Sequence, residues 1–283
     1  MRELAAYGLG EREIAALTRR TTRTVYIIGD SDTGKTTLAA AVARRLARTR
    51  RTALVDLDAG QATLGLPTTF GWKLCGARRA GEGMYFVGTT SPTGYFDLWV
   101  EGAAELVGRA RRRARTVVID TCGLARGPEG RRLHERIADA VRPDVVVAIE
   151  REGELAELLD GLGRAGRRVI RASVPAGVRR RSRARRRSYR CARFRAYFQG
   201  GRELCLSLDD VAVVRPRPDP VGRIASLRDE AGVDAALGIV RKVDSARGTI
   251  TLWTPLRLRT AVRAVVLGSM RIARDGRQLA RNI

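Results

Sequence analysis

The chain has 283 residues and a net charge of +24, because 54 Lys and Arg residues stand against 30 Asp and Glu residues. Hydrophobic residues make up 44% of it, which excludes a disordered chain and is enough for one large or two smaller packed domains. Only three of the basic residues are lysine. The excess of arginine favours a polyanionic partner such as nucleic acid, although a genome rich in G and C would also raise the arginine count.

Histidine and cysteine usage excludes several kinds of site. His134 is the only histidine, so a His-rich metal site and chemistry that needs a His pair are excluded. The four cysteines form no CxxC pair, so we expect neither a zinc site nor a disulfide framework, and we expect a reducing, cytoplasmic location. No apolar run approaches the ~18 residues of a membrane helix. Residues 1–23 lack the pattern of a signal peptide.

The hydrophobic pattern predicts that strands alternate with helices over the first part of the chain. An amphipathic helix is expected first, and the predicted helices are 3–19, 35–48, 95–113, 129–141 and 152–163. The predicted strands are 25–28, 53–57, 84–87, 117–119, 145–149 and 168–170. Such alternation implies an α/β fold, with a parallel sheet and helices on both faces.

The pattern changes after about residue 203. Short β runs are predicted at 204–208, 211–214, 237–243, 249–253 and 262–267, and residues 244–248 form a hairpin-type turn between two of them. We therefore predict two domains, 1–203 and a small C-terminal β domain at 204–283, packed against each other.

A phosphate-binding pattern lies between the strand at 25–28 and the helix at 35–48. The segment from Gly29 to Thr36, GDSDTGKT, fits G-x-x-x-x-G-K-[ST], the P-loop of NTPases. Its glycines let backbone N–H groups approach phosphate oxygens, Lys35 would bridge the β and γ phosphates, and Thr36 would ligate Mg²⁺. A chance match in a glycine-containing loop is the alternative. The candidate nucleotide-binding residues are Gly29, Asp30, Ser31, Asp32, Thr33, Gly34, Lys35, Thr36 and Thr37.

Two other predicted strands end in acidic residues. Asp56 and Asp58 would lie on the same side of one strand end, and Asp120 ends another strand in the usual Walker B form. The carboxyl ends of parallel strands face the ligand crevice. A carboxylate there can hold a Mg²⁺ shell, and Asp58 could accept a proton from an attacking hydroxyl. Aspartates that only form turns at strand ends are the alternative.

An arginine-rich segment follows the last predicted strand of the first domain. Residues 179–195 contain ten arginines and no acid, and aromatic residues at 194–198 can anchor a helix. Arg186, Arg190 and Arg193 would share one helical face. One side of such a helix could close over a triphosphate while the other follows a nucleic-acid backbone. A disordered or merely solvated segment is the alternative.

These blocks occur in the order found in a known family. The chain resembles, over about residues 23–283, the polynucleotide 5′-hydroxyl kinases related to the Clp subunit of the pre-mRNA cleavage factor and to the Grc and Nol ribosomal-RNA processing kinases. The matching blocks are GDSDTGKT at 29–36, DLDAGQ at 56–61, GTTSPTG at 88–94, VVIDTCG at 117–123 and RSRARRRSYRCARFRAYF at 181–198. The third block resembles the family's clasp loop, and the fifth resembles its arginine lid, expected at about 176–199.

The resemblance implies a kinase that uses ATP and Mg²⁺ to phosphorylate the 5′-hydroxyl end of RNA or DNA. It implies Asp58 as general base, with Lys35 and Arg186 as the other catalytic residues and Arg190 on the nucleotide. The implied Mg²⁺ residues are Thr36, Asp58 and Asp120. The implied nucleic-acid-binding residues are Gln61, Thr89, Thr90, Gly94, Leu124 and Arg181, and Gln61 would also order the Mg²⁺ shell.

The sequence also departs from the family. Leu124 stands where many members have a tryptophan that can stack on an acceptor base, so we expect a weaker grip or a broader choice of acceptor. Asp30 replaces a common proline, and the family's large N-terminal β domain is not expected, because about 24 residues precede the first strand. Two other functions stay open: a non-catalytic, ATP-holding subunit of a nucleic-acid-processing complex, and a kinase for a small metabolite.

Overall fold

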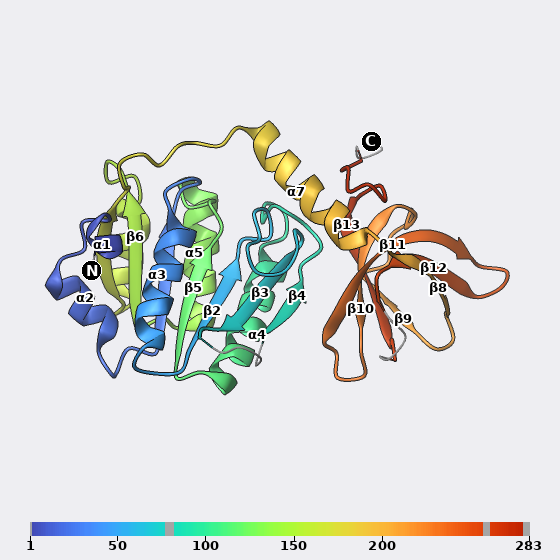
Figure 1. Ribbon diagram of the computed structural model, residues 1–283, viewed down its shortest axis with the longest axis horizontal. Coiled ribbons are helices and arrows are strands. Elements are labelled where there is room, and N and C mark those ends of the chain that lie inside the picture. Colours follow the sequence, from blue (N-terminus) through green and yellow to red (C-terminus); the bar gives the residue numbers. More distant parts are fainter. Residues whose placement is uncertain (1, 77–81, 257–260, 280–283) are drawn as a thin grey trace.

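The computed structural model describes residues 2–76, 82–256 and 261–279, which form two sheets connected by a long helix (Figure 1). The first sheet has the strand order β4-β3-β2-β5-β1-β6-β7. Its strands are β1 (Thr24–Gly29), β2 (Thr52–Leu57), β3 (Thr69–Leu74), β4 (Glu82–Phe86), β5 (Thr116–Thr121), β6 (Val145–Glu150) and β7 (Arg168–Ser173). Strand β3 runs antiparallel to both of its neighbours, β4 and β2. The neighbouring strands β2, β5, β1, β6 and β7 run parallel to one another.

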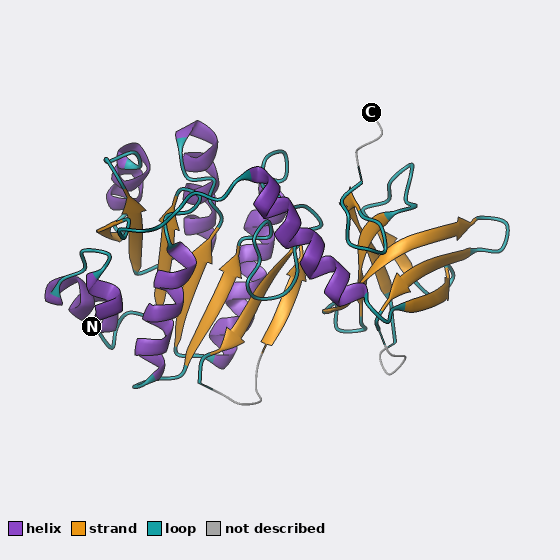
Figure 2. Ribbon diagram, turned by 45° about the horizontal axis from the view of Figure 1, so that its top comes forward, coloured by secondary structure: helices purple, strands orange, loops and turns teal. Residues whose placement is uncertain are grey.

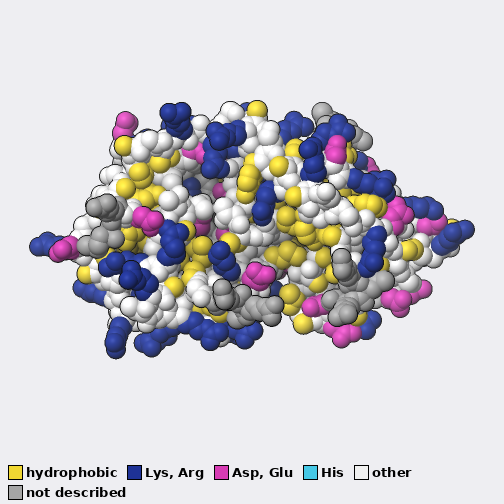
Figure 3. Space-filling view, viewed as in Figure 1, with side chains coloured by type: hydrophobic (Ala, Val, Ile, Leu, Met, Phe, Trp, Pro, Cys, Tyr) yellow, Lys and Arg dark blue, Asp and Glu magenta, His cyan; other side chains and the backbone are white. Residues whose placement is uncertain are grey.

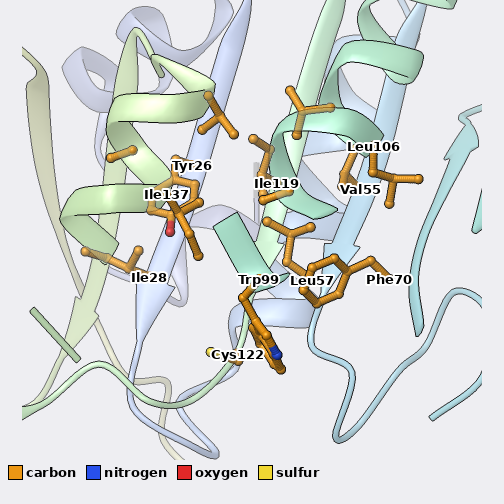
Figure 4. Packing of buried hydrophobic residues seen from close by; sticks show 14 of the residues in the cluster. Tyr26, Ile28, Val55, Leu57, Phe70, Trp99, Leu106, Ile119, Cys122 and Ile137 are labelled. Atoms are coloured by element: carbon orange, nitrogen blue, oxygen red, sulfur yellow. The ribbon is translucent and has the colours of Figure 1, made fainter. Parts of the chain in front are cut away.

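Helices cover both faces of this sheet, as predicted. They are α1 (Arg2–Ala5), α2 (Glu11–Thr18), α3 (Lys35–Ala47), α4 (Phe96–Arg113), α5 (Gly127–Val141) and α6 (Ala156–Arg164). Successive side chains of a strand point to opposite faces. In β1, Tyr26 and Ile28 therefore pack with α4, α5 and α6 (Figure 4), whereas Val25 and Ile27 pack with α1, α2 and α3.

One expectation about the first domain was wrong, and one of its strands was missed. The helix predicted at 3–19 is two helices, because the chain turns at Gly8 (φ +71°) and α2 begins after Gly10. Strand β3 was not predicted. Its centre is Gly71, a poor strand former, but a Cβ there would lie 2.4 Å from the Leu64 carbonyl oxygen, so the packing requires glycine.

The second sheet has the order β8-β12-β11-β10-β13-β9 and is antiparallel except for the β13–β9 pair. Its strands are β8 (Arg202–Ser207), β9 (Ala212–Val214), β10 (Arg223–Arg228), β11 (Asp234–Asp244), β12 (Thr249–Thr254) and β13 (Ala264–Arg271). The predicted turn at 244–248 joins β11 to β12. Strand β10 was missed, because its sequence RIASLR is neither alternating nor rich in β-branched residues.

The two sheets meet at β4 and at helix α7 (Arg183–Phe198), which lies between them (Figure 2). Phe86 of β4 and Phe194 and Phe198 of α7 pack with apolar residues of the second sheet. The Phe86 backbone N–H donates to Asp234 Oδ2 at 2.7 Å. The second sheet therefore fixes the end of α7, while the beginning of α7 reaches the first sheet.

The predicted fold class, a helix-flanked α/β sheet with a second β sheet toward the C-terminus, is confirmed. None of the helices in the described ranges is long and apolar enough to cross a membrane.

Candidate functional site

The loop between β1 and α3 is shaped to hold phosphate. Gly34 (φ +90°) directly precedes α3, whose first backbone N–H groups and positive dipole end therefore face the loop. Lys35 is buried, and its Nζ donates to the Asp30 carbonyl oxygen at 2.8 Å. A Cβ at Gly29 would lie 2.7 Å from the Ile149 carbonyl oxygen, so the loop packs tightly on β6.

The remaining loop residues divide between the interior and the surface. Thr33 is buried and its hydroxyl donates to the Asp30 carbonyl oxygen at 2.9 Å. Thr36 and Thr37 are exposed at the start of α3. A Cβ at Gly123 would come within 2.2 Å of the Ser31 Oγ, which shows that Ser31 lies against the loop after β5. The loop therefore leaves Thr36 at the surface with its side chain in contact with Asp120, while the loop backbone is fixed by neighbouring strands.

Asp30 has a structural explanation that the sequence did not offer. Its carboxylate lies 2.9 Å from Arg126 Nε and accepts the Ser31 N–H at 2.7 Å. Arg126 also contacts Glu154 at 3.1 Å. The negative charge of Asp30 is therefore compensated by a neighbouring arginine, so it does not oppose phosphate binding as an isolated carboxylate would.

Three neighbouring strands bring the predicted acids to one edge of the sheet. In the pairing of β2 with β5, Asp56 lies opposite Asp120, and β5 also lies beside β1, which leads into the P-loop. Asp120 is buried, and its Oδ1 has no hydrogen-bond partner among the residues that the structure describes. Burial, followed by the Asp56 carboxylate, raises the pKa of Asp120 to about 8, although Lys35 acts in the opposite direction.

Asp56 and Asp58 have different surroundings. The Asp56 carboxylate is buried and accepts the backbone N–H groups of Asp58, Thr63 and Leu64 at 2.7–3.0 Å, together with the Thr63 hydroxyl at 2.8 Å. Asp58 is half-buried. Within the described part of the chain, only its Oδ1 accepts hydrogen bonds, from the N–H groups of Gly60 (3.0 Å) and Gln61 (2.9 Å). Asp56 therefore holds the loop after β2, whereas Asp58 keeps one carboxylate oxygen available.

Burial raises the pKa of Asp58, and the nearby Lys35 ammonium opposes this effect. A carboxylate with a raised pKa is a stronger base while it remains ionised. The position of Asp58 at the end of β2, beside Lys35, is therefore compatible with accepting a proton in this crevice.

These side chains fit a Mg²⁺ site. The unpartnered Oδ1 of Asp120 lies in a group of mutually repelling carboxylates, and a divalent cation would offset that repulsion. Thr36 and Asp58 would supply further oxygen ligands. The described residues contain no cluster of three or more His, Cys, Asp or Glu side chains suited to a metal. Mg²⁺ does not require one, because it is usually held by one or two carboxylates, phosphates and water.

Helix α7, which forms the predicted lid and is called the lid helix below, contacts the P-loop through its beginning and through the residues just before it. Arg186 Nη2 lies 2.6 Å from Asp32 Oδ2, and the Arg181 backbone N–H donates to the same oxygen at 2.8 Å. Burial would raise the pKa of Asp32, but these two contacts outweigh it and lower the pKa. Arg181 Nη1 also donates to Gln61 Oε1 at 3.2 Å. The arginine-rich segment is therefore a helix docked on the P-loop, not a disordered tail.

Farther along the lid helix, Arg190 lies away from the P-loop contacts. Its Nη2 donates to Gln278 Oε1 at 3.4 Å, and Arg187 Nη2 donates to the Gln278 carbonyl oxygen at 3.2 Å. The hydroxyl of Tyr189 donates to the Ala62 carbonyl oxygen at 2.8 Å. The structure thus brings Arg186 to the P-loop, whereas the segment after β13 holds Arg190.

The predicted clasp loop lies beside the DLDAGQ loop. A Cβ at Gly60 would lie 2.7 Å from the Thr90 carbonyl oxygen, so the two loops are in close contact. The Thr89 hydroxyl donates to the Ser91 carbonyl oxygen at 3.1 Å, and Gly94 (φ +80°) is exposed just before α4. Leu124, in contrast, is half-buried and packs against the core shared with α4, α5 and α6.

A pocket of about 550 Å³ separates the clasp loop from the second sheet. Thr89 and Thr90 line one side, and Tyr95, Arg217 and Gln278 are among its other lining residues. Arg217 Nε and Gln278 Nε2 are buried and have no hydrogen-bond partners in the described ranges. Sequence reasoning missed Tyr95 and Arg217, because neither belongs to a motif and only the packing of the second sheet brings Arg217 to the clasp.

Comparison with known proteins identifies the family. Residues 29–200 match the family model of the mRNA cleavage and polyadenylation factor CLP1 P-loop. The chain belongs to the CLP1 P-loop family. The resemblance inferred from the five sequence blocks is thereby confirmed, since the matched range contains all of them.

Individual relatives of this CLP1 family chain are archaeal and eukaryotic. A polyribonucleotide 5′-hydroxyl-kinase of Pyrococcus horikoshii is 33% identical over 197 residues, which are 67% of this chain and 54% of the relative. A kinase of the same name from Thermococcus kodakarensis is 25% identical and matches over 90% of both chains. The polyribonucleotide 5′-hydroxyl-kinase Clp1 of Xenopus laevis is 32% identical over 63% of this chain and 44% of the relative.

The CLP1 family chain spans about half the length of the Pyrococcus relatives that it matches. A chain from the solved structure of the Clp1p–Pcf11p complex has a similar fold, with a TM-score of 0.70 at 16% identity. The likeness covers 90% of this chain and 76% of that chain, and it therefore includes the second sheet as well as the first.

Proposed function

We propose that this CLP1 family chain is a polynucleotide kinase that transfers the γ-phosphoryl group of ATP to the 5′-hydroxyl end of RNA, with Mg²⁺ bound. The observation that carries the proposal is Asp58. One of its carboxylate oxygens accepts no hydrogen bond from the described residues, and it lies at the same sheet edge as Lys35 and the unpartnered Oδ1 of Asp120. The names of the archaeal and Xenopus relatives support the same reaction and acceptor.

The P-loop and the lid would bind the donor. Backbone N–H groups of residues 29–36 and the Lys35 ammonium would hold the β and γ phosphates. Arg186, already positioned at the P-loop by Asp32, would stabilise charge on the γ-phosphoryl oxygens during transfer. Mg²⁺, held by Thr36, Asp58 and Asp120, would neutralise charge that develops between the β and γ phosphates.

Asp58 would act on the acceptor. As the 5′-hydroxyl oxygen forms its bond to the γ-phosphorus, its proton passes to the Asp58 carboxylate, and the bond between the γ-phosphorus and the β–γ bridging oxygen breaks to release ADP. The hydrogen bonds from Gly60 and Gln61 orient this carboxylate before substrate binds. In-line transfer of this kind depends on positioning, charge neutralisation and one base, so it needs no histidine.

The acceptor strand would enter beside the clasp loop. The pocket between this loop and the second sheet is lined by Tyr95, which can stack on a base, and by Arg217, whose guanidinium group can contact a phosphate. None of these groups requires a 2′-hydroxyl, so we propose DNA as a second acceptor.

Label transfer from γ-labelled ATP tests the proposal. RNA and DNA oligonucleotides with 5′-hydroxyl ends are compared with the same oligonucleotides bearing a 5′-phosphate, with and without Mg²⁺. We expect label on the 5′-hydroxyl oligonucleotides only, and only with Mg²⁺. ATP binding without transfer to any oligonucleotide would instead identify a non-catalytic, ATP-holding subunit. Transfer to free nucleosides alone would identify a kinase for small metabolites.

A further inference from the structure

A basic pocket of about 610 Å³ lies at the edge of the first sheet opposite the P-loop. Its lining contains two threonines, no acid and five arginines, which are Arg20, Arg45, Arg48, Arg50 and Arg115. They come from the segment before β1, from the end of α3 and the turn that follows it, and from the residue before β5. Figure 3 shows Lys and Arg side chains gathered along this lower edge, below α3 and β5.

Four of these five arginines lack a partner. The side chains of Arg20, Arg45, Arg48 and Arg115 make no hydrogen bond or ion pair with the described residues, and the Nε of Arg45 is also buried. Only Arg50 is engaged, by donating to the carbonyl oxygens of Arg19 at 2.6 Å and Leu17 at 3.3 Å. Burial, and then the nearby Arg115 guanidinium, lower the pKa of Arg50, so the cluster carries a cost in repulsion.

Helix electrostatics explain only part of the cluster. Arginines near the last turn of a helix interact favourably with its dipole, which accounts for Arg45 and Arg48 at the end of α3. Arg115 directly precedes a strand, and Arg20 lies in the segment between α2 and β1. Three segments distant in sequence therefore contribute unpaired guanidinium groups to one concave surface, which is the arrangement expected of a site for several phosphates.

We propose that this pocket binds the phosphate backbone of the acceptor nucleic acid at a distance from its 5′ end. An extended polyanion is favoured over a small anion because exposed arginines continue along the same edge at Arg19, Arg23, Arg51 and Arg113. The six-residue strands β1 and β5 span ~20 Å, so the pocket would contact a part of the acceptor several nucleotides from the site of transfer. The choice of acceptor rests on the proposed kinase function, whereas binding at the pocket does not require ATP.

The test compares two variants that remove the same charge. Arg48→Ala/Arg115→Ala changes two exposed, unpaired arginines of the pocket, and Arg241→Ala/Arg247→Ala changes two exposed arginines in the β11–β12 hairpin of the second sheet. Fluorescence anisotropy without ATP measures the affinity for a hairpin RNA of about 30 nucleotides and for a trinucleotide over a range of salt concentrations.

For the pocket variant we expect Kd for the hairpin RNA to rise roughly tenfold and the salt slope to fall by about 1.5 to 2, while binding of the trinucleotide is unchanged. The control variant, Arg241→Ala/Arg247→Ala, should change the Kd for this RNA and the salt slope by only a small fraction of these amounts. Thermal unfolding gives a second readout: the pocket variant should melt at a higher temperature than the wild type without nucleic acid, because it has less like-charge repulsion.

Three results would overturn the proposal. Equal losses in both variants would show only a generic basic surface. A loss of trinucleotide binding in the pocket variant would place these residues near the 5′ end. If inorganic tripolyphosphate binds to the wild type but not to the pocket variant, while hairpin RNA binds to both equally, the pocket is a site for a small anion. Failure of the kinase function alone would remove label transfer and leave these binding differences in place.

Discussion

Asp58 and Asp56 are two residues apart, and of the two only Asp58 has a carboxylate oxygen that accepts no hydrogen bond from the described residues. Asp58→Asn keeps the size of the side chain but cannot take up the 5′-hydroxyl proton. We expect the rate of transfer to fall by roughly 10²- to 10⁴-fold while ATP still binds, as measured by single-turnover label transfer and equilibrium dialysis. Turnover near that of the wild type would exclude Asp58 as the base and direct attention to Asp120.

Arg186 and Arg183 lie three residues apart in the lid helix. Comparing variants of the two distinguishes a catalytic arginine from a general basic surface. Arg186 contacts Asp32 of the P-loop, whereas the Arg183 side chain is exposed and makes no hydrogen bond or ion pair with the described residues. Arg186→Ala should lower kcat by about 10²-fold or more, because it removes a donor from the γ-phosphoryl group. Arg183→Ala should only weaken RNA binding slightly. Equally mild effects in single-turnover assays would make the segment an electrostatic surface without a catalytic arginine.

His134 should make the stability of the chain depend on pH. It is fully buried, its Nδ1 lies 2.7 Å from the Tyr26 hydroxyl, and burial lowers the pKa of His134 to about 3. The unfolded chain, with a His pKa of about 6.5, therefore binds one more proton between these values, so stability is lost as the pH falls below about 6.5. His134→Gln keeps an acceptor for Tyr26 and removes this proton.

Urea unfolding of the wild type and His134→Gln between about pH 7 and pH 4.5 measures the effect. We expect the free energy of unfolding of the wild type to fall more steeply, by up to about 1.4 kcal/mol per pH unit. Parallel pH profiles for the two proteins would show that His134 titrates normally in the folded chain.

At the scale of single residues, the sequence located the P-loop, the two acidic strand ends and the arginine segment, because each is a local pattern. It favoured Asp58 over Asp56 as the base, but it could not show that Asp56 holds the loop, since the N–H groups of residues 60–64 reach the two carboxylates only in the folded chain. It also gave no reason for Asp30, because its partner Arg126 is far away in the sequence. Partners of this kind become visible only when the fold brings them together.

The lid helix α7 is supported along its length. Arg186 binds its beginning to the P-loop, and Phe194 and Phe198 pack its end against the second sheet. The segment after β13 supports its middle, where a Cβ at Gly276 (φ +82°) would lie 2.4 Å from the Cys191 carbonyl oxygen. Gly276→Ala should therefore displace this segment, including Gln278, and loosen Arg190. We expect the KM for ATP to rise several-fold and amide exchange in α7 to increase.

Gly248→Ala is the matched control, because Gly248 also has a positive φ (+57°) but has no atoms within 4 Å of its ideal Cβ position. It should cost about 1 kcal/mol of stability through backbone strain and leave the KM for ATP unchanged. If both variants change the KM for ATP equally, the contact with Cys191 does not support the lid.

Elements were predictable where packing and sequence pattern agree. Strands such as β1 and β6 are continuous apolar runs, so their burial on both faces is visible in the sequence. Strands β3 and β10 are buried as well, but glycine, alanine or serine interrupts their apolar runs, and in β3 close packing requires the glycine. The division of the N-terminal segment into two helices depends on a glycine turn at residues 8–10, which the helical periodicity of residues 3–19 conceals.

At the scale of the whole molecule, the two sheets share a buried carboxylate. Asp234 of β11 accepts the Phe86 N–H of β4 at 2.7 Å, the Ser226 hydroxyl at 2.6 Å and Arg228 Nε at 2.8 Å. Asp234→Ala would leave all three donors without this acceptor, so we expect the free energy of unfolding to fall by about 3 kcal/mol. Asp244→Ala, which removes the partner of the exposed Lys242 at the end of β11, should have little effect. Equal effects in chemical denaturation would mean that Asp234 does not stabilise the junction.

The near absence of lysine gives the molecule an unusual chemical profile. Lys73 and Lys242 are exposed, while Lys35 is 6% exposed and donates its amine to a carbonyl oxygen of its own loop. An acylating reagent that does not react with guanidinium groups would therefore find two accessible lysine side chains, Lys73 and Lys242, and one protected lysine, Lys35, in the nucleotide loop. The acylation state of a single side chain, read by mass spectrometry, would report whether that loop is empty, filled or opened, against a background that scarcely reacts.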